Sequence, residues 1–256
     1  MAMSQQLQAR AVQLAALVLF LGTWELTCRL AKIDPHVLPA LSSVLVTLVE
    51  LLGSASFLGH AGVTLSRVVI AFLIGAPLAI LAGFFVGERS ALSRRLGPLL
   101  NLLVAIPQSM LLPMFILLFG VANVQKVVFG VTHIFFVLML TTIAAVLSVP
   151  ANLVLAARSF GANSAQIYRE IYLPAMLPLL VAGMRMAMIF DVVGILLAEM
   201  YASQSGIGFL MMRWGEDYKM NQLIAGVLLI AVVTIAFNEL MRALESRISA
   251  NSGSTA

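Results

Sequence analysis

The side chains of this sequence best able to do chemistry are a carboxylate and an imidazole within long apolar stretches. Asp191 lies in the stretch 175–198, and His133 lies near the start of the stretch 126–149. Ionisable groups inside a membrane are costly, so they are candidates for carrying protons or contacting solutes. The alternative for His133, which we favour, is a packed histidine. The alternative for Asp191, which we also favour, is an ion pair with Arg67 or Arg185. Arg185 lies six residues earlier and is a poor partner on the same helix face, so an arginine of another span is favoured.

Two polar candidates follow a proline in a third apolar stretch, 97–120. Pro107 removes a backbone hydrogen bond, so this stretch is predicted to be kinked or broken. Irregular backbone at membrane depth is tolerated where it is buried in protein or lines a watery cavity. Gln108 and Ser109 come directly after the break. They are candidates either for lining a solute pathway or for bonding the carbonyls that Pro107 leaves unpaired.

The sequence lacks the motifs of several enzyme classes. It holds no Gly-x-x-x-x-Gly-Lys-Ser/Thr loop, no His-Glu-x-x-His helix and no Gly-x-Ser-x-Gly turn. Cys28 is the only cysteine, so we expect neither an internal disulfide nor a thiolate metal site. We therefore expect a chain that is not an enzyme, with no catalytic residue, metal or cofactor of its own. A membrane enzyme is the weakest alternative.

The composition requires that membrane helices position these groups. Of the 256 residues, 61% are hydrophobic and only 10% are charged, which is far too apolar for a soluble domain. Six stretches approach the roughly 20 residues that a bilayer needs. We predict an all-α fold with a single transmembrane domain over residues 11–248, between an N-terminal segment, 1–10, and a disordered tail, 249–256. The predicted spans are 11–30, 63–87, 97–120, 126–149, 175–198 and 222–240.

Two local patterns predict contacts within this fold. Gly75, Gly83 and Gly87 are spaced to give the second span a flat face, which permits close packing against another helix. Glu25 and Arg29 are four residues apart near the end of the first span, so they are expected to pair on one helix face.

The break between the fourth and fifth spans, residues 150–174, is too apolar for a solvated linker. Gln166 favours helix, and Gly161 tolerates a positive φ, so we predict two short helical pieces joined at Gly161. Pro174 is expected in the first turn of the following span. A half-apolar helix–turn–helix at a membrane surface favours docking to another protein. The alternative is an ordinary amphipathic loop.

The spacing in this break resembles the "EAA" loop of ABC importer permeases: two alanines, three residues, glycine, nine residues, isoleucine, one residue and Leu-Pro. The matching residues are Ala156, Ala157, Gly161, Ile171, Leu173 and Pro174. Leu155 stands where the family has an acidic residue. The resemblance to the nitrate/sulfonate/taurine-type subgroup covers residues 37–248. Its further segments, in the same order, are 64–68, 106–120 and 198–210.

The resemblance implies the six-helix fold of a type I ABC importer permease in a bacterial cytoplasmic (inner) membrane. The loop would be a coupling helix that docks into a dimer of separate ATPase subunits, which would bind ATP and Mg. The implied docking residues are Ala156, Ala157, Gly161, Ala162, Gln166, Tyr168, Ile171, Leu173 and Pro174. The other implied partners are a second permease copy, in a homodimer, and an external solute-binding protein.

The distribution of basic residues favours cytoplasmic termini. Inner segments would then carry eight basic residues: Arg10, Arg89, Arg94, Arg95, Arg158, Arg169, Arg242 and Arg247. Outer segments would carry five: Arg29, Lys32, Lys126, Arg213 and Lys219. Positive charge accumulates on cytoplasmic loops, so the excess supports this orientation and places the break 150–174 in the cytoplasm. We take the net charge of +4 as this orientation signal and expect no nucleic-acid partner.

The alternative function is a proton-coupled secondary transporter that uses Asp191 and His133. Against it, the chain shows neither a second acidic site nor an inverted repeat. The resemblance instead implies import of a small polar solute, such as nitrate, a sulfonate, taurine or another small organic molecule. An acidic residue in the fifth span fits an anion pathway poorly.

Overall fold

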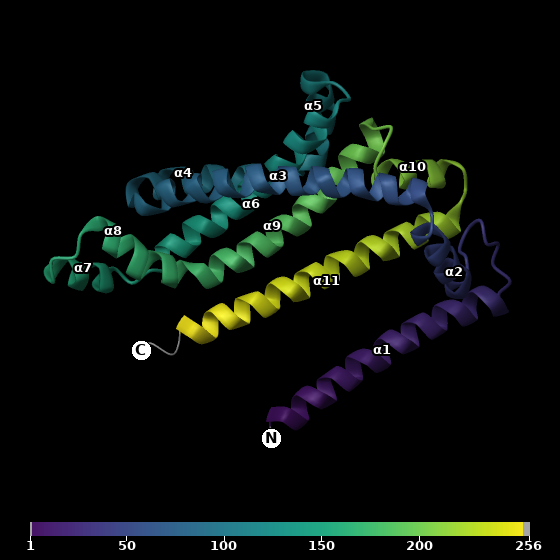
Figure 1. The fold of residues 1–256 in the computed structure, drawn as a ribbon, viewed down its shortest axis with the longest axis horizontal. Helices are drawn as coiled ribbons and strands as arrows, with labels where there is room; N and C mark the ends of the chain where they lie inside the picture. The colour runs from purple at the N-terminus through teal and green to yellow at the C-terminus, as the bar shows by residue number, and fades with distance from the viewer. Residues whose placement is uncertain (1, 253–256) are drawn as a thin grey trace. The chain divides into compact units, whose positions relative to one another are not determined.

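The computed structural model describes the backbone of residues 2–252 and the side chains of residues 11–243. All the regular elements of this part of the chain are helices, which confirms the all-α prediction (Figure 1). The elements are α1 (Ala2–Leu30), α2 (Leu41–Leu52), α3 (Ala55–Glu88), α4 (Ser90–Ala105), the 3-10 turn η1 (Gln108–Leu111), α5 (Leu112–Phe119), α6 (Asn123–Leu147), α7 (Ala151–Ser159), α8 (Ser164–Ile167), the π-helical turn η2 (Tyr168–Tyr172), α9 (Leu173–Ala202), α10 (Ile207–Glu216) and α11 (Met220–Ser252).

Five described segments are long and apolar enough to cross a membrane. They are Ala11–Leu30, Ala55–Glu88, Asn123–Leu147, Ser164–Ala202 and Met220–Ala243. A sixth span is present if α4 and the following η1–α5 segment count as one, with a bend of 77° between them. The bend lies at Ile106 and Pro107, whose backbones are extended, so the predicted break at Pro107 is confirmed.

Several helices are longer than the sequence predicted. α1 already begins at Ala2, α3 begins eight residues before the predicted span, and α11 continues to Ser252. Hydropathy marks only the part of a helix that suits lipid, whereas the backbone bonds continue into polar flanks that contain no proline. Residue 1 and residues 253–256, and the side chains of Arg10 and Arg247, lie outside the described residues.

The chain divides into two compact units. The first comprises the chain up to His60 together with Leu210–Ala231, and the second comprises Ala61–Phe209 and the chain from Val232 onward.

Polar contacts hold the end of α1 to α2 in the first unit. Arg29 Nε lies 2.5 Å from Glu25 Oε1, so the predicted ion pair is confirmed. Glu25 Oε2 also accepts a hydrogen bond from the backbone N–H of Ser42 at 3.0 Å. Trp24 Nε1 donates to the carbonyl of Pro39 at 3.1 Å. These bonds fix the irregular segment between α1 and α2.

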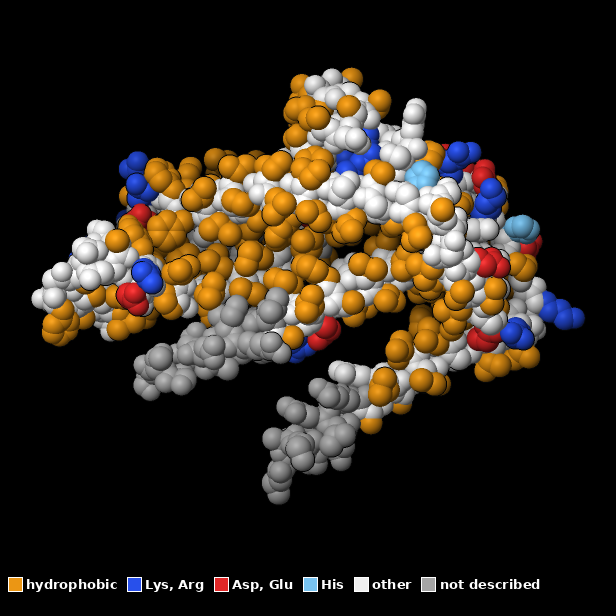
Figure 2. Space-filling view, in the orientation of Figure 1, with side chains coloured by type: hydrophobic (Ala, Val, Ile, Leu, Met, Phe, Trp, Pro, Cys, Tyr) orange, Lys and Arg blue, Asp and Glu red, His pale blue; other side chains and the backbone are white. Residues whose placement is uncertain are grey.

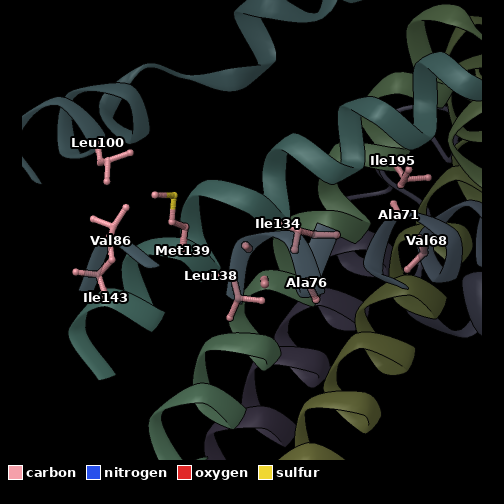
Figure 3. Close-up of a cluster of buried hydrophobic side chains, with 12 residues drawn as sticks. Val68, Ala71, Ala76, Val86, Leu100, Ile134, Leu138, Met139, Ile143 and Ile195 are labelled. Atoms are coloured by element: carbon pink, nitrogen blue, oxygen red, sulfur yellow. The ribbon is translucent and has the colours of Figure 1, made fainter. Parts of the chain in front are cut away.

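The core of the second unit lies between α3, α4, α6 and α9 (Figure 3). Its buried residues are Val68, Ala71, Ala76, Ala79, Val86, Leu100, Ile134, Leu138, Met139, Ile143, Ala187 and Ile195. The many alanines reduce the thickness of the interfaces, which suits close contact between membrane helices.

The glycines of α3 let α6 approach closely, as predicted. A Cβ atom on Gly83 would lie 2.6 Å from Thr142 Cβ and 2.7 Å from the Met139 carbonyl oxygen. Cβ atoms on Gly75 and Gly87 would lie 3.2 Å from Ile134 Cβ and 2.9 Å from Val146 Cβ, respectively. All four neighbours belong to α6, so the two backbones pack against each other along this face.

The outward faces of the spans are mainly hydrophobic, as Figure 2 shows over α3. Large exposed side chains on this helix include Leu65, Leu73, Leu81 and Phe85. Such a surface would be unfavourable in water but suits contact with lipid tails or another apolar protein surface.

We predict that Gly83→Ala destabilises the protein by about 1–3 kcal/mol, since a methyl group would enter a contact without free space. Gly97→Ala in α4 is the matched control, because a Cβ there has no neighbour within 4 Å. That substitution should be neutral or stabilise by at most about 1 kcal/mol. Thermal unfolding of the two variants in detergent would compare them, and equal stabilities would contradict the close packing.

Candidate functional site

The segment between α6 and α9 is a helix–turn–helix that turns at Gly161. α7 ends at Ser159, and Gly161 has a φ of +82°, which a side-chain-bearing residue adopts only with strain. The backbone N–H of Gly161 donates to the carbonyl of Arg158, and that of Ala162 donates to the carbonyl of Ala157, each at 3.0 Å. This pattern ends an α-helix in a left-handed residue, as predicted for Gly161.

The second helical piece begins with a reciprocal cap. The Asn163 side chain accepts from the backbone N–H of Gln166 at 2.9 Å, and the Gln166 side chain accepts from the backbone N–H of Asn163 at 2.8 Å. The sequence signal for this cap, a capping residue followed three positions later by glutamine, was missed. The π-helical turn η2 then leads into α9, where Pro174 occupies the first turn as predicted.

An open groove of about 520 Å³ lies along the two pieces. Its lining residues are Ala157, Phe160, Gly161, Ala162, Gln166, Ile167, Glu170 and Ile171. Several large apolar side chains are exposed on this segment, most of all Phe160 at 92% and Leu155 at 68%. Such exposure of apolar side chains on a short segment between two spans is typical of an interaction surface.

The structure brings only some of the predicted docking residues together. Ala157, Gly161, Ala162, Gln166 and Ile171 line the groove. Ala156, Tyr168, Leu173 and Pro174 do not. The Tyr168 hydroxyl instead donates a hydrogen bond to Glu88 at the end of α3.

The polar residues after Pro107 differ from each other in their surroundings. Gln108 Nε2 donates to the carbonyl of Thr132 in α6 at 3.5 Å, so it does not bond a carbonyl left unpaired by Pro107. Gln108 Oε1 is buried without a partner in the described part of the chain. Ser109 is exposed.

His133 is a packed histidine, which is the alternative that the sequence favoured. Its Nδ1 lies 2.9 Å from the carbonyl oxygen of Phe129, one turn earlier in α6. Gly194 of α9 faces the imidazole so closely that a Cβ there would lie 2.9 Å from the ring.

Asp191 is fully buried, at 0% exposure, where α9 faces Gly130 of α6. Neither carboxylate oxygen has a hydrogen-bond partner among the described residues. The predicted ion pair between Asp191 and Arg67 is therefore wrong, because Arg67 pairs with Glu199 instead. No hydrogen bond joins Asp191 to His133 within the described residues either, so a direct proton relay is not formed in this conformation.

The partner of Arg67 is Glu199 in α9. Arg67 Nη1 lies 2.7 Å from Glu199 Oε1, and both residues are buried, at 4% and 0% exposure. Arg67 Nη2 donates to Asn123 Oδ1 at 2.5 Å, which connects the start of α6 to the same pair. The sequence signal for this pair is an arginine in one span and a glutamate near the end of another.

Further donors satisfy the Glu199 carboxylate. It accepts from the Thr64 hydroxyl at 2.8 Å and from the backbone N–H of Gly208 at 3.0 Å. The Thr64 hydroxyl in turn accepts from the backbone N–H of Ile207 at 2.7 Å. Two of the N–H groups left unpaired at the start of α10 are thereby bonded.

Lys126 lies beside this network and is also buried. Its ammonium donates to the carbonyls of Val121 at 2.5 Å, Ala122 at 3.3 Å and Ala202. The carbonyls at the end of α9 and before α6 therefore share one cation. Lys126 is an internal structural residue, whereas the sequence suggested an outer loop charge.

Among the residues whose side chains are described, no group of three or more histidine, cysteine, aspartate or glutamate residues could hold a metal ion.

The helices, their apolar outer faces and the buried polar groups define a multi-pass membrane protein. The chain belongs to the family of binding-protein-dependent transport system inner membrane components, whose model matches residues 75–250. This confirms the resemblance that the EAA-like spacing suggested.

Individual relatives extend over nearly the whole chain. The putative aliphatic sulfonates transport permease protein SsuC of Bacillus subtilis (strain 168) is 28% identical over 228 residues, covering 89% of this chain and 83% of the relative. The taurine transport system permease protein TauC of Escherichia coli (strain K12) is 26% identical over 243 residues, covering 93% and 88%.

The fold is also similar to a solved structure, an inward-facing conformation of the MetNI methionine ABC transporter. The TM-score is 0.59 at 20% sequence identity, and the match covers 73% of this chain and 91% of that chain. This protein is thus the permease of a binding-protein-dependent ABC importer, a non-catalytic subunit of the inner membrane. Its family implies a partner ATPase, which binds the ATP, and a solute-binding protein.

We predict that Arg67→Met destabilises the protein by roughly 3–5 kcal/mol, because it leaves the buried Glu199 carboxylate without its cation. Arg29→Met, which breaks the exposed pair with Glu25, is the control and should change stability far less. Adding Glu199→Leu to Arg67→Met should recover part of the loss. Thermal unfolding in detergent measures all three, and an Arg67→Met variant as stable as Arg29→Met would refute the role of this pair.

Proposed function

We propose that this chain forms half of the translocation pathway of a type I ABC importer, with six spans and both termini in the cytoplasm. The segment 150–174 is its coupling element and docks into the partner ATPase. Orientation is supported by the basic residues, since the five outer charges fall to four when the internal Lys126 is left out. The inner count stays at eight.

The single observation that carries this function is the exposed helix–turn–helix between α6 and α9. It presents Phe160 and the groove beside it, and its fold is held by internal bonds at Gly161 and Asn163. A rigid segment with exposed apolar side chains suits insertion into another protein. Leu155, in place of the acidic residue of the EAA pattern, makes the contact more apolar at that point.

In the proposed mechanism, closure of an ATPase dimer on ATP moves two docked coupling elements together. The spans then shift from an inward-open to an outward-open arrangement, and solute passes from the binding protein into the pathway. Hydrolysis of ATP restores the inward-open state. The nucleotide acts by favouring one of two arrangements of the same helices.

The second half of the pathway would be another copy of this chain. The bent pair of α4 and α5 interrupts the helical backbone at Ile106 and Pro107. Such irregular backbone within a membrane requires a protein or water neighbour. Exposed apolar side chains on α5, including Leu117 and Leu118, offer a surface for such a neighbour.

The proposed solute is a small sulfonate, taurine or a similar small organic molecule. Support comes from the named relatives, which are permeases for aliphatic sulfonates and for taurine. Asp191 was expected to disfavour an anion, but its carboxylate is buried between helices and does not face an open pathway in this conformation. Binding measurements on the cognate solute-binding protein, with taurine and an alkanesulfonate, would identify the solute.

Gly161→Val is expected to abolish solute uptake while membrane insertion continues, because a β-branched residue at a φ of +82° costs about 1–3 kcal/mol and distorts the turn. Gly120→Val is the matched control. Gly120 also has a positive φ, +67°, and a Cβ there also meets nothing within 4 Å. Co-purification of the ATPase should be lost for Gly161→Val and kept for Gly120→Val. Retention of the ATPase and of uptake by Gly161→Val would argue against the coupling role.

The second candidate function is proton-coupled transport through Asp191, whose unpartnered carboxylate is the observation in its favour. Uptake into right-side-out vesicles, with ATP inside and the binding protein outside, distinguishes the two functions. For the importer, uptake requires ATP and the binding protein and persists with a proton uncoupler, and Asp191→Asn retains it. Uptake that collapses with the uncoupler, in the presence of ATP, would favour the proton-coupled function.

A further inference from the structure

We propose that Tyr168 and Glu88 form a positioning contact that passes movement of the coupling element to α3. The inference rests on the proposed function and deepens it. It assigns Tyr168 to the inner side of the segment, where it links the segment to the spans, instead of to the surface that meets the ATPase.

The first support is the contact itself. The Tyr168 hydroxyl donates to a carboxylate oxygen of Glu88, the last residue of α3. The Tyr168 ring packs edge-on against Phe84, one turn earlier in α3, with 5.6 Å between ring centroids. A hydrogen bond to a charged acceptor and an aromatic contact therefore hold one side chain to two successive turns of α3.

A second aromatic residue strengthens the same junction. The Tyr172 ring lies 6.0 Å from Phe84 and 5.6 Å from Tyr168, measured between centroids. Two of these rings, Phe84 and Tyr172, also pack against a buried apolar cluster of α6 and α9 that includes Val146 and Met176. The end of α3, the coupling element and the start of α9 consequently share one packed region.

α3 transmits a displacement further because it has no clearance from α6. A Cβ on Gly87, next to Glu88, would lie 2.9 Å from Val146 Cβ of α6. Gly83 is even closer to α6, since a Cβ there would lie 2.6 Å from Thr142 Cβ. A shift of Glu88 across the α6 face must therefore move α6 with α3, since packed interiors have little free volume.

The continuous backbone from the loop into α9 is a weaker route for the same movement. The residues that join the two, Tyr168–Tyr172, form a π-helical turn. Such turns are local irregularities at which helices bend. The side-chain contact to α3 supplies a second connection that bypasses this irregular turn.

Tyr172 offers a matched control for the Tyr168 hydroxyl. Both tyrosines belong to the same aromatic cluster and the same turn. In the described part of the chain the Tyr172 hydroxyl makes no hydrogen bond, whereas that of Tyr168 bonds Glu88. Tyr172→Phe thus removes an equivalent oxygen without breaking the proposed connection.

Hydrogen exchange of the whole importer, measured by mass spectrometry with and without ATP plus vanadate, tests the proposal. In the wild type, nucleotide should change exchange in both 151–172 and 80–90. In Tyr168→Phe the response of 151–172 should persist, while that of 80–90 should fall by about tenfold, the effect of losing one hydrogen bond to a charged group. Tyr172→Phe should respond as the wild type does.

Variants of the acceptor provide an independent arm. Glu88→Ala should behave as Tyr168→Phe does, Glu88→Gln should restore most of the response because its amide oxygen still accepts, and the double variant Tyr168→Phe/Glu88→Ala should be no worse than either single variant. If Tyr168→Phe does not fold, the Glu88 variants decide.

The outcomes separate this inference from the proposed function. A wild type that does not retain the ATPase, or in which nucleotide alters neither segment, overturns the proposed function. A response of 151–172 without one of 80–90 in the wild type overturns only the Tyr168–Glu88 link. The same conclusion follows if 80–90 responds undiminished in both Tyr168→Phe and Glu88→Ala, or if Tyr172→Phe reduces it equally.

Discussion

The buried ion pair of Arg67 and Glu199 is the constraint on which the arrangement of the second unit depends. Each charge would be unfavourable alone in apolar surroundings, so neither helix can move away from the other without exposing an unpaired ion. Because Asn123, Thr64 and Gly208 bond the same two residues, the pair also fixes the start of α6 and the start of α10. One end of α3, α6 and α9 is thereby held in a single arrangement.

The opposite ends of these helices are held by different means. There, glycines of α3 allow backbone contact with α6, and aromatic side chains of α3 and the coupling element pack together. These contacts contain no buried charge, so helices held by them can move together without leaving an ion unpaired. The same three spans are thus firmly anchored at one end and connected to the helix–turn–helix at the other, where motion from a partner would arrive.

Patterns local to a few residues were readable in the sequence. Hydropathy located the spans, Pro107 predicted the broken helix, and Gly161 predicted the turn between two short helices, because each depends only on the residues of one segment. The glycine face of α3 was also readable, although its partner helix was not.

Contacts between distant segments were not readable in the same way. Arg67 had several possible carboxylate partners, and the choice of Glu199 over Asp191 follows from the register of α9 against α3, which no single segment encodes. Lys126 illustrates the same limit. Its position near a predicted span end suggested a surface charge, yet three backbone carbonyls enclose it. Tyr168 belonged to a recognisable motif, but the motif did not show which way its hydroxyl faces.

The bend of 77° between α4 and α5 has a consequence for the surrounding bilayer. The last carbonyls of α4 lose their helical partners where Ile106 and Pro107 become extended, and hydrocarbon tails cannot replace those bonds. Lipid cannot seal this part of the surface as it seals the smooth flank of a straight helix. Water or a neighbouring subunit must therefore bond these carbonyls at the bend. The fold of this one chain thus determines where water can enter the membrane beside it.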